Sequence, residues 1–190
     1  MRIAAVRVTP IRLQFARPVR TAQGEFTARD SVLLELRDTD GVAGYGEAAP
    51  WPGFGTETAA QAGALLTAAV VSLTDLELEP GQWTPALVTL LHQAPAARAA
   101  VQGALWDLAA RRGGKPLAEH LAACVGPLRG AGVQRVAVSA LLVAREPDAL
   151  RDEAASATAA GHRAVKLKVG AAPLAVDVAR VRAVREGLGL

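Results

Sequence analysis

The sequence AVKLKVG, residues 164–170, alternates apolar and basic side chains. A period of two is typical of a β-strand, so this pattern predicts Val165, Leu167 and Val169 on one face and Lys166 and Lys168 on the other. An antiparallel strand with both lysines in water would show the same alternation. A helix pattern directly before this segment favours a parallel strand instead, with one face under helices and the other facing the interior of a sheet or barrel.

The segments around AVKLKVG follow the order strand, helix, strand, helix. The strands are predicted over 133–142 and 163–169, and the helices begin at Pro147 and Pro173 and end near Ala160 and Glu186. In the last helix one apolar stripe is predicted to face the sheet, formed by Leu174, Val178, Val181 and Val184. Short loops between such elements are typical of a parallel α/β sheet. Two parallel strands leave unpaired edges, so this second domain, 133–190, is predicted to be unfinished.

The first domain, 1–126, is predicted to be α+β. Three antiparallel strands are expected over 2–15, 29–38 and 42–47, the last two joined at the turn Asp40-Gly41. Helices are expected over 57–72, 84–92 and from Pro95 to Gly113, with Thr56 as the cap of the first. A turn-rich linker over 126–132 separates this domain from the second.

The lysines are the most informative residues of the composition. The chain has 21 Lys and Arg residues, of which only three are Lys, and two of those are Lys166 and Lys168. Arginine stays charged, whereas lysine can exchange a proton when its pKa is lowered. Two enclosed ammonium groups lower each other's pKa by desolvation and repulsion, which makes one of them a general base near neutral pH.

The remaining composition favours a globular, cytoplasmic protein. The net charge is +3, 51% of the residues are apolar, and no apolar run reaches the roughly 18 residues of a membrane span. The basic residues are interleaved with acids and match no nucleic-acid motif, so neither nucleic acid nor membrane is expected as a partner. Cys124 is the one cysteine, and with His120 it offers two ligands at most, fewer than a zinc site needs. A surface histidine beside a semi-buried thiol is expected there.

The segment GYGEAAPWPGFGTET, residues 44–58, is rich in glycine and proline. Gly44 and Gly46 follow a strand, but no third glycine completes a dinucleotide-binding fingerprint. Two interpretations stay open, a structural turn and an anion site at the helix N-terminus near Thr56.

Three motifs together resemble the enolase superfamily, its muconate-lactonizing subgroup, and within it the o-succinylbenzoate synthases. The loop 44–58 is similar to a pattern in which G-[WY]-G-E precedes P-x-P-G-F and E-T. The segment ALWDLAARRGGKPL, 104–117, resembles the superfamily's A-x-x-D-L helix and turn. AVKLKVG resembles its K-x-K strand, which an Asp-containing helix follows, here with Asp177.

The resemblance implies an α+β capping domain followed by the first βα units of a (β/α) barrel that is incomplete in this chain. It implies Lys168 as the proton-transferring lysine and Lys166 as its electrostatic neighbour. It also implies that the loops 17–29 and 50–58 lie over the barrel mouth and determine substrate choice. The substrate-specificity residues predicted from it are Thr21, Gly24, Arg29, Gly53, Phe54, Gly55 and Thr56.

The resemblance further implies Mg²⁺ as cofactor, with ligands that lie beyond this chain. After Lys168 the sequence has only Asp177 and Glu186 as acids, and both are predicted on a helix surface, so no metal ligand is assigned. The implied function is an o-succinylbenzoate synthase-like lyase that dehydrates the small carboxylate 2-succinyl-6-hydroxy-2,4-cyclohexadiene-1-carboxylate in menaquinone biosynthesis, with Lys168 as general base and acid. A dipeptide epimerase, a muconate cycloisomerase and a non-catalytic, self-associating interaction domain remain alternatives.

Overall fold

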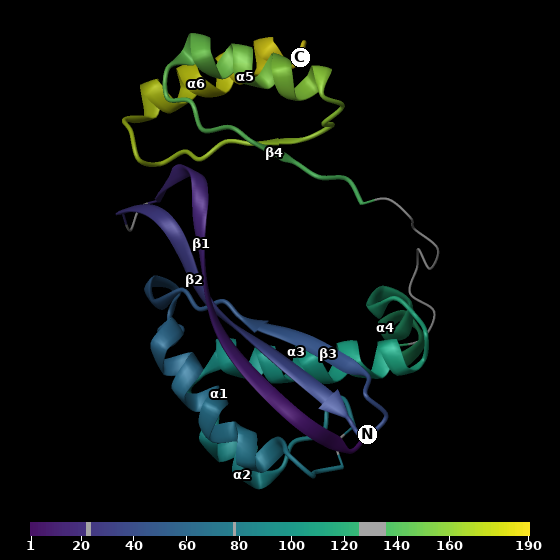
Figure 1. Ribbon diagram of the computed structural model, residues 1–190. Coiled ribbons are helices and arrows are strands. Elements are labelled where there is room, and N and C mark those ends of the chain that lie inside the picture. Colours follow the sequence, from purple (N-terminus) through teal and green to yellow (C-terminus); the bar gives the residue numbers. More distant parts are fainter. Residues whose placement is uncertain (22–23, 78, 126–135) are drawn as a thin grey trace. The chain divides into compact units, whose positions relative to one another are not determined.

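The computed structural model describes residues 1–21, 24–77, 79–125 and 136–190 (Figure 1). The chain divides into two compact units, Met1–Arg129 and Gly130–Leu190. The predicted linker, 126–132, lies outside the described residues, as do the first residues of the predicted strand 133–142. The domain limits 1–126 and 133–190 therefore stay a prediction.

The first unit is built on a three-stranded antiparallel sheet in the order β1-β2-β3. The strands are β1 (Ile3–Thr21), β2 (Gly24–Asp38) and β3 (Ala43–Ala48). The prediction of a loop over 17–29 is wrong, because β1 and β2 stay paired as far as Thr21 and Gly24. The pairing of the two strands shifts register between Gln14 and Val19. Beyond this shift the apolar Val19 lies opposite Phe26 as a cross-strand pair.

Helices follow the sheet in the sequence. They are α1 (Ala59–Leu73), α2 (Pro85–Leu90), α3 (Pro95–Arg112) and α4 (Leu117–Val125), with a short 3₁₀ turn η1 (Pro52–Phe54) before them. The cap of α1 is Thr58 and not the predicted Thr56, because Thr58 and Gln61 have the spacing of a capping box and form both of its hydrogen bonds. No helix in the described part of the chain is long and apolar enough to cross a bilayer.

The core of the first unit lies between the sheet and these helices. Alternate residues of β2 point into it, namely Val32, Leu34 and Leu36. The helices contribute mostly alanine and leucine: Ala62, Leu66, Ala69 and Leu73 from α1 and Ala97, Ala100, Val101, Ala104, Leu105 and Leu108 from α3. Small side chains let α1 and α3 lie close against one face of the sheet (Figure 1).

The backbones of β3 and α3 lie in direct contact. A Cβ on Gly46 would overlap the carbonyl oxygen of Ala100, and one on Gly44 would overlap the backbone of Ala104 and Leu108. The Tyr45 amide between them donates to the Asp107 carboxylate at 2.9 Å. The close packing of α3 against β3 therefore explains the two glycines of G-Y-G-E.

The second unit is a parallel pair of strands covered by two helices. Its elements are β4 (Ala140–Leu141), α5 (Pro147–Ala159), β5 (Val165–Lys166) and α6 (Leu174–Gly187). Both strands are much shorter than predicted, because in the described residues each has only the other as a hydrogen-bonding neighbour. The helices pack on one side of the pair through Leu142, Leu150, Ala154 and Val184 (Figure 1).

The predicted apolar stripe of α6 is largely wrong. Val184 is buried, but Leu174 is 80% exposed, and Val178 and Val181 are exposed as well. The face of α6 that turns inward instead carries Asp177, so the prediction of Asp177 on the helix surface is also wrong. Small residues explain the rotation, because Gly187 lets α6 lie directly against the carbonyl of Arg151 in α5.

We predict that Gly46→Ala lowers the free energy of unfolding of the first unit by about 1–3 kcal/mol, because the new methyl group must displace the backbone of α3. Urea denaturation followed by circular dichroism measures the change. Gly63→Ala is the matched control: it adds the same methyl group to α1, where the nearest atom is 3.6 Å away. There we expect no loss, and a gain of up to about 1 kcal/mol from helix propensity.

We also predict that residues 1–190 expressed alone self-associate or exchange amide hydrogens rapidly in the second unit. Val136, Val138 and Leu141 are exposed apolar residues at or beside β4, whose outer edge has no partner in the described chain. Light scattering against concentration and hydrogen exchange measure the two effects. A monomer with slow exchange throughout 136–169 would contradict this prediction.

Candidate functional site

The two candidate lysines lie at the end of β5. Lys166 is the last residue of β5, Lys168 follows two residues later, and both side chains are exposed. Val165 and Leu167 point the other way and pack on the cluster under α5 and α6. The predicted alternation is therefore present at these four residues, with the lysines on the side away from the helices. Val169, predicted beside the other apolar residues, is more than half exposed.

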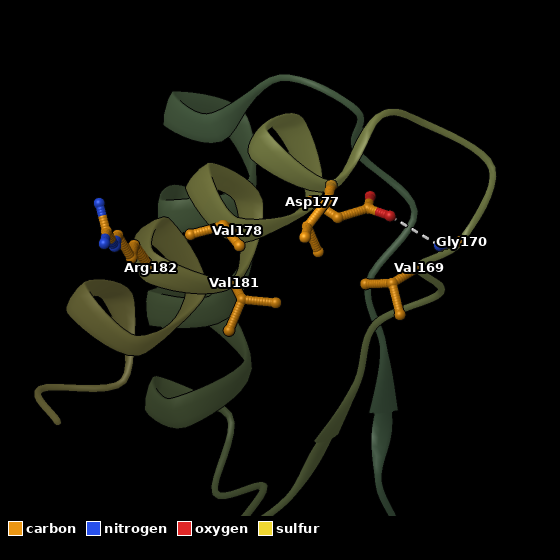
Figure 2. Close-up of a pocket in the computed structure, with 7 residues that line it drawn as sticks. Val169, Gly170, Asp177, Val178, Val181 and Arg182 are labelled. Atoms are coloured by element: carbon orange, nitrogen blue, oxygen red, sulfur yellow. Dashed lines mark hydrogen bonds between the residues drawn. The ribbon is translucent and has the colours of Figure 1, made fainter.

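A buried carboxylate fixes the backbone directly after Lys168. Asp177, in the first turn of α6, accepts a hydrogen bond from the Gly170 amide at 2.7 Å (Figure 2). It accepts a second one from Arg180 Nη1 at 2.8 Å. The same Arg180 nitrogen donates to the carbonyl oxygen of Lys168 at 3.3 Å. The pKa of Asp177 is lowered, chiefly by the Gly170 hydrogen bond and further by Arg180, although burial opposes the shift. Asp177 is thus a carboxylate at neutral pH.

Beside this contact lies an apolar cavity of about 390 Å³. Its lining comes from the loop after β5 and from the exposed side of α6: Val169, Gly170, Leu174, Asp177, Val178, Val181 and Arg182. Figure 2 shows the valines around it, with Asp177 turned toward Gly170. The cavity lies on the side of α6 that packs on nothing in the second unit as described.

A second cavity, of about 560 Å³, lies in the first unit, between β2 and the segment 49–58. Trp51 lines it, and the centroid of its ring lies 4.8 Å from that of Phe26 and 6.1 Å from that of Phe54. The guanidinium of Arg29 lies 4.5 Å from the Trp51 ring, a cation–π contact, and donates a hydrogen bond to the carbonyl of Ala49. The cavity therefore joins an aromatic wall to a positive charge.

The segment 49–58 is held at several points. The Trp51 amide donates to Thr56 Oγ1 at 2.5 Å, and Gly55 takes a left-handed conformation that closes the turn on Pro52. The Glu57 carboxylate accepts from the amides of Ala97 at 2.7 Å and Ala96 at 3.3 Å. Because Ala94, the N-cap residue of α3, provides no side-chain cap, Glu57 performs that role from 40 residues away from Ala97. The interpretation of this segment as a structural turn is the one that these contacts support.

The predicted specificity residues lie in different places. Arg29 and Gly53 line the larger cavity. Phe54 is 75% exposed, and Thr56 is turned toward Trp51. Thr21 and Gly24 lie at the paired ends of β1 and β2. Sequence reasoning missed Phe26, Trp51 and Glu57, although a tryptophan between two prolines was a signal for a shaped aromatic wall.

The described residues contain no group of three or more His, Cys, Asp or Glu side chains that could hold a metal ion. On α4, Cys124 Sγ lies 3.9 Å from His120 Nε2. The thiol is exposed, not semi-buried as predicted. Mg²⁺ needs several oxygen ligands, and a lysine ammonium has no lone pair to offer. These residues therefore do not fit a Mg²⁺ site.

The sequence matches the family model described as "Mandelate racemase / muconate lactonizing enzyme, N-terminal domain" over residues 3–122. The chain belongs to the mandelate racemase/muconate lactonizing enzyme family. Its membership of the enolase superfamily, which the three motifs predicted, is confirmed.

Relatives in this family match all or part of the chain. A hydrophobic dipeptide epimerase from Enterococcus faecalis is 28% identical over 100% of this chain and 51% of its own length. An o-succinylbenzoate synthase from Geobacillus stearothermophilus is 32% identical over 58% of this chain and 30% of its own. The crystal structure of the Enterococcus faecalis dipeptide epimerase with Mg and the dipeptide L-Leu-L-Tyr has a TM-score of 0.78 at 26% identity, covering 100% of this chain and 51% of that one.

This chain spans about half the length of the curated relatives that match it throughout. The first unit is the N-terminal capping domain of the family, with a sheet and packed helices. The βα units that follow lie in the part of the chain that also matches longer members of the family, which is consistent with an incomplete barrel. The predicted fold class is confirmed.

We predict that Glu57→Ala lowers the free energy of unfolding of the first unit by about 1 kcal/mol, the usual effect of losing a helix cap, and raises amide exchange at Ala96 and Ala97. Glu57→Gln keeps an acceptor oxygen and should lose less. The exposed Glu47, changed to Ala, serves as control. Equal losses for Glu57→Ala and Glu47→Ala in denaturant melts would show that Glu57 does not cap α3.

Proposed function

We propose that this chain is the N-terminal half of an enzyme that removes the proton α to a carboxylate in a small-molecule substrate. Lys168 is the base. The observation that carries the proposal is the orientation of the lysines: both leave the face on which the helices pack, and the backbone beyond Lys168 is hydrogen-bonded in place.

Lysine suits this step for a physical reason. A base must release its own proton before it takes one from carbon, which a lysine amine can do. Lys166 lies two residues before Lys168, about 6–7 Å away at the usual rise per residue of a strand. Arginine at either position would remain charged and could not act as the base.

After proton transfer Lys168 is an ammonium. In a dehydration its proton goes to the departing hydroxyl group, which leaves as water. In an epimerisation a second acid, which we assign to residues outside this chain, protonates the other face of the carbon, and Lys168 later returns its proton to solvent. The same residue therefore serves a lyase and an epimerase.

Our first candidate for the substrate is 2-succinyl-6-hydroxy-2,4-cyclohexadiene-1-carboxylate, dehydrated as in an o-succinylbenzoate synthase of menaquinone biosynthesis. The segment PWPGFGTET supports it, since it resembles the loop of that group. The matching o-succinylbenzoate synthases also support it, although two of them cover only 58% and 43% of this chain.

Dipeptide epimerisation is about equally supported. The dipeptide epimerases align with the whole chain, including the lysine strand. An aromatic cavity beside Trp51 and Phe26 would accommodate an apolar side chain. The substrate is in both cases a small carboxylate.

Mg²⁺ belongs to the proposal for the longer protein. Structural neighbours hold it, whereas the described residues of this chain offer no set of ligands, so we assign the ligands to residues outside the chain. We also propose a cytoplasmic location, with which the free, exposed thiol of Cys124 is compatible.

We predict that Lys168→Ala in the longer protein lowers turnover by about 10²- to 10⁴-fold, the usual contribution of a general base, and leaves circular dichroism unchanged. Lys115→Ala is the matched control, because Lys115 is the third lysine of the chain and lies exposed after α3. Exchange of the substrate's α-proton with deuterated water measures the step directly. Undiminished exchange in Lys168→Ala would remove Lys168 from the mechanism.

The substrate panel then separates the candidates. Dehydration of the cyclohexadiene carboxylate with no action on dipeptides would identify the synthase, and inversion of dipeptides would identify the epimerase. A longer protein that exchanges no α-proton in any of these carboxylates would instead favour the non-catalytic interaction domain.

A further inference from the structure

Charged residues occupy the inward face of α6, while apolar residues of the same helix lie in water. Asp177 is 7% exposed, whereas Leu174 is 80% exposed. Burying a carboxylate and a guanidinium costs free energy that a well-packed apolar pair would not, so this arrangement is not the one that stability alone favours. One atom remains unsatisfied as well: Arg180 Nε is buried without a hydrogen-bond partner in the described structure.

The backbone that these side chains contact is the backbone around Lys168. The strand ladder ends just before it, at the hydrogen bond from the Leu142 amide to the Lys166 carbonyl at 3.0 Å. From there the chain turns away toward α6. Arg180 binds the carbonyl of Lys168, and Asp177 binds the amide of Gly170, so the two side chains hold the chain on both sides of Val169. They supply the fixed contacts that the ladder supplies up to Lys166.

The two contacts form one unit. Arg180 Nη1 reaches both Asp177 Oδ1 and the Lys168 carbonyl, so loss of the carboxylate would release the Gly170 amide and leave the guanidinium without its counter-charge. A general base needs its nitrogen within a few tenths of an ångström of the productive position, and misplacement by about 1 Å can cost about 100-fold in rate. The anchoring of the Lys168 backbone is therefore functionally important.

We propose that Asp177 and Arg180 are positioning residues for Lys168: they hold the backbone that carries the base and do not touch the substrate. The proposal rests on the proposed function of Lys168. It assigns a role to a carboxylate that sequence reasoning placed on the helix surface.

The test uses the longer protein with three substitutions. Asp177→Asn keeps an oxygen for the Gly170 amide and loses the ion pair, Asp177→Ala loses both, and Arg180→Lys keeps the charge. Asp148→Asn is the matched control, because Asp148 also begins a helix and pairs with an arginine three residues later, at 2.7 Å, yet its side chain is 89% exposed and far in sequence from the lysines.

We expect Asp177→Ala to lower kcat at least about tenfold with KM within about twofold, and Asp177→Asn to recover part of that loss. Asp148→Asn should change neither constant. Hydrogen exchange should show faster exchange at Gly170 in Asp177→Ala, with α1 and α3 unchanged. Arg180→Lys should lie between wild type and Asp177→Ala.

Two results would overturn the proposal. One is an Asp177→Ala enzyme with unchanged kcat. The other is an Asp177→Ala enzyme in which kcat falls, KM rises and the melting temperature falls together, with no recovery in Asp177→Asn. That result would show that Asp177 serves the fold only. Lys168→Ala separates this proposal from the proposed function: if that variant remains active, the function fails, whereas an inactive Lys168→Ala beside a fully active Asp177→Ala rejects only the positioning role.

Discussion

The direct approach of α3 to β3 is the constraint on which the first unit depends. It is possible because Gly44 and Gly46 have no side chains where the backbone of α3 lies. The position of α3 in turn places the amides of Ala96 and Ala97 where Glu57 can cap them. Glu57 lies near the end of the segment 49–58, which also carries Trp51. The contact between the backbones of α3 and β3 therefore helps to position the aromatic wall of the larger cavity.

Charge pairs secure the other end of the same helix. Arg112, the last residue of α3, binds the buried carboxylate of Asp38 and also Asp40 in the turn between β2 and β3. Burial raises the pKa of Asp38, but the hydrogen bonds from Arg112 and from the backbone amides outweigh it, so the pKa is lowered overall. Asp38 therefore stabilises the fold as an anion, and its contribution is lost as the pH falls through its folded-state pKa. Both ends of α3 are thus held by carboxylates from outside the helix.

Local sequence patterns predicted the helices and strands, but they did not predict contacts between residues far apart in the sequence. The lysine face was foreseeable, because alternation along a strand depends on backbone geometry alone. The strands of the second unit are shorter than predicted, because strand length depends on pairing with neighbouring strands, which a local sequence pattern does not reveal. Asp177 was misplaced because an acid in the first turn of a helix ordinarily faces water, and only the amide of Gly170 and the guanidinium of Arg180 make its burial tolerable. The cavity at Trp51 joins residues more than 20 positions apart, Arg29 among them, which no periodicity connects.

The separation between packed core residues and exposed residues explains why two different reactions are about equally compatible with the sequence. The side chains that stabilise each unit are alanines, leucines and glycines of the packed faces, and none of them needs to contact a substrate. Phe54, at the tip of the segment 49–58, is exposed and contributes little to the core, so its replacement changes a surface at small cost to the fold. The lysines likewise project from the face on which neither described helix of the second unit packs. On the proposed function, substrate choice can therefore vary at exposed tips while Lys168 and the backbone that carries it stay the same.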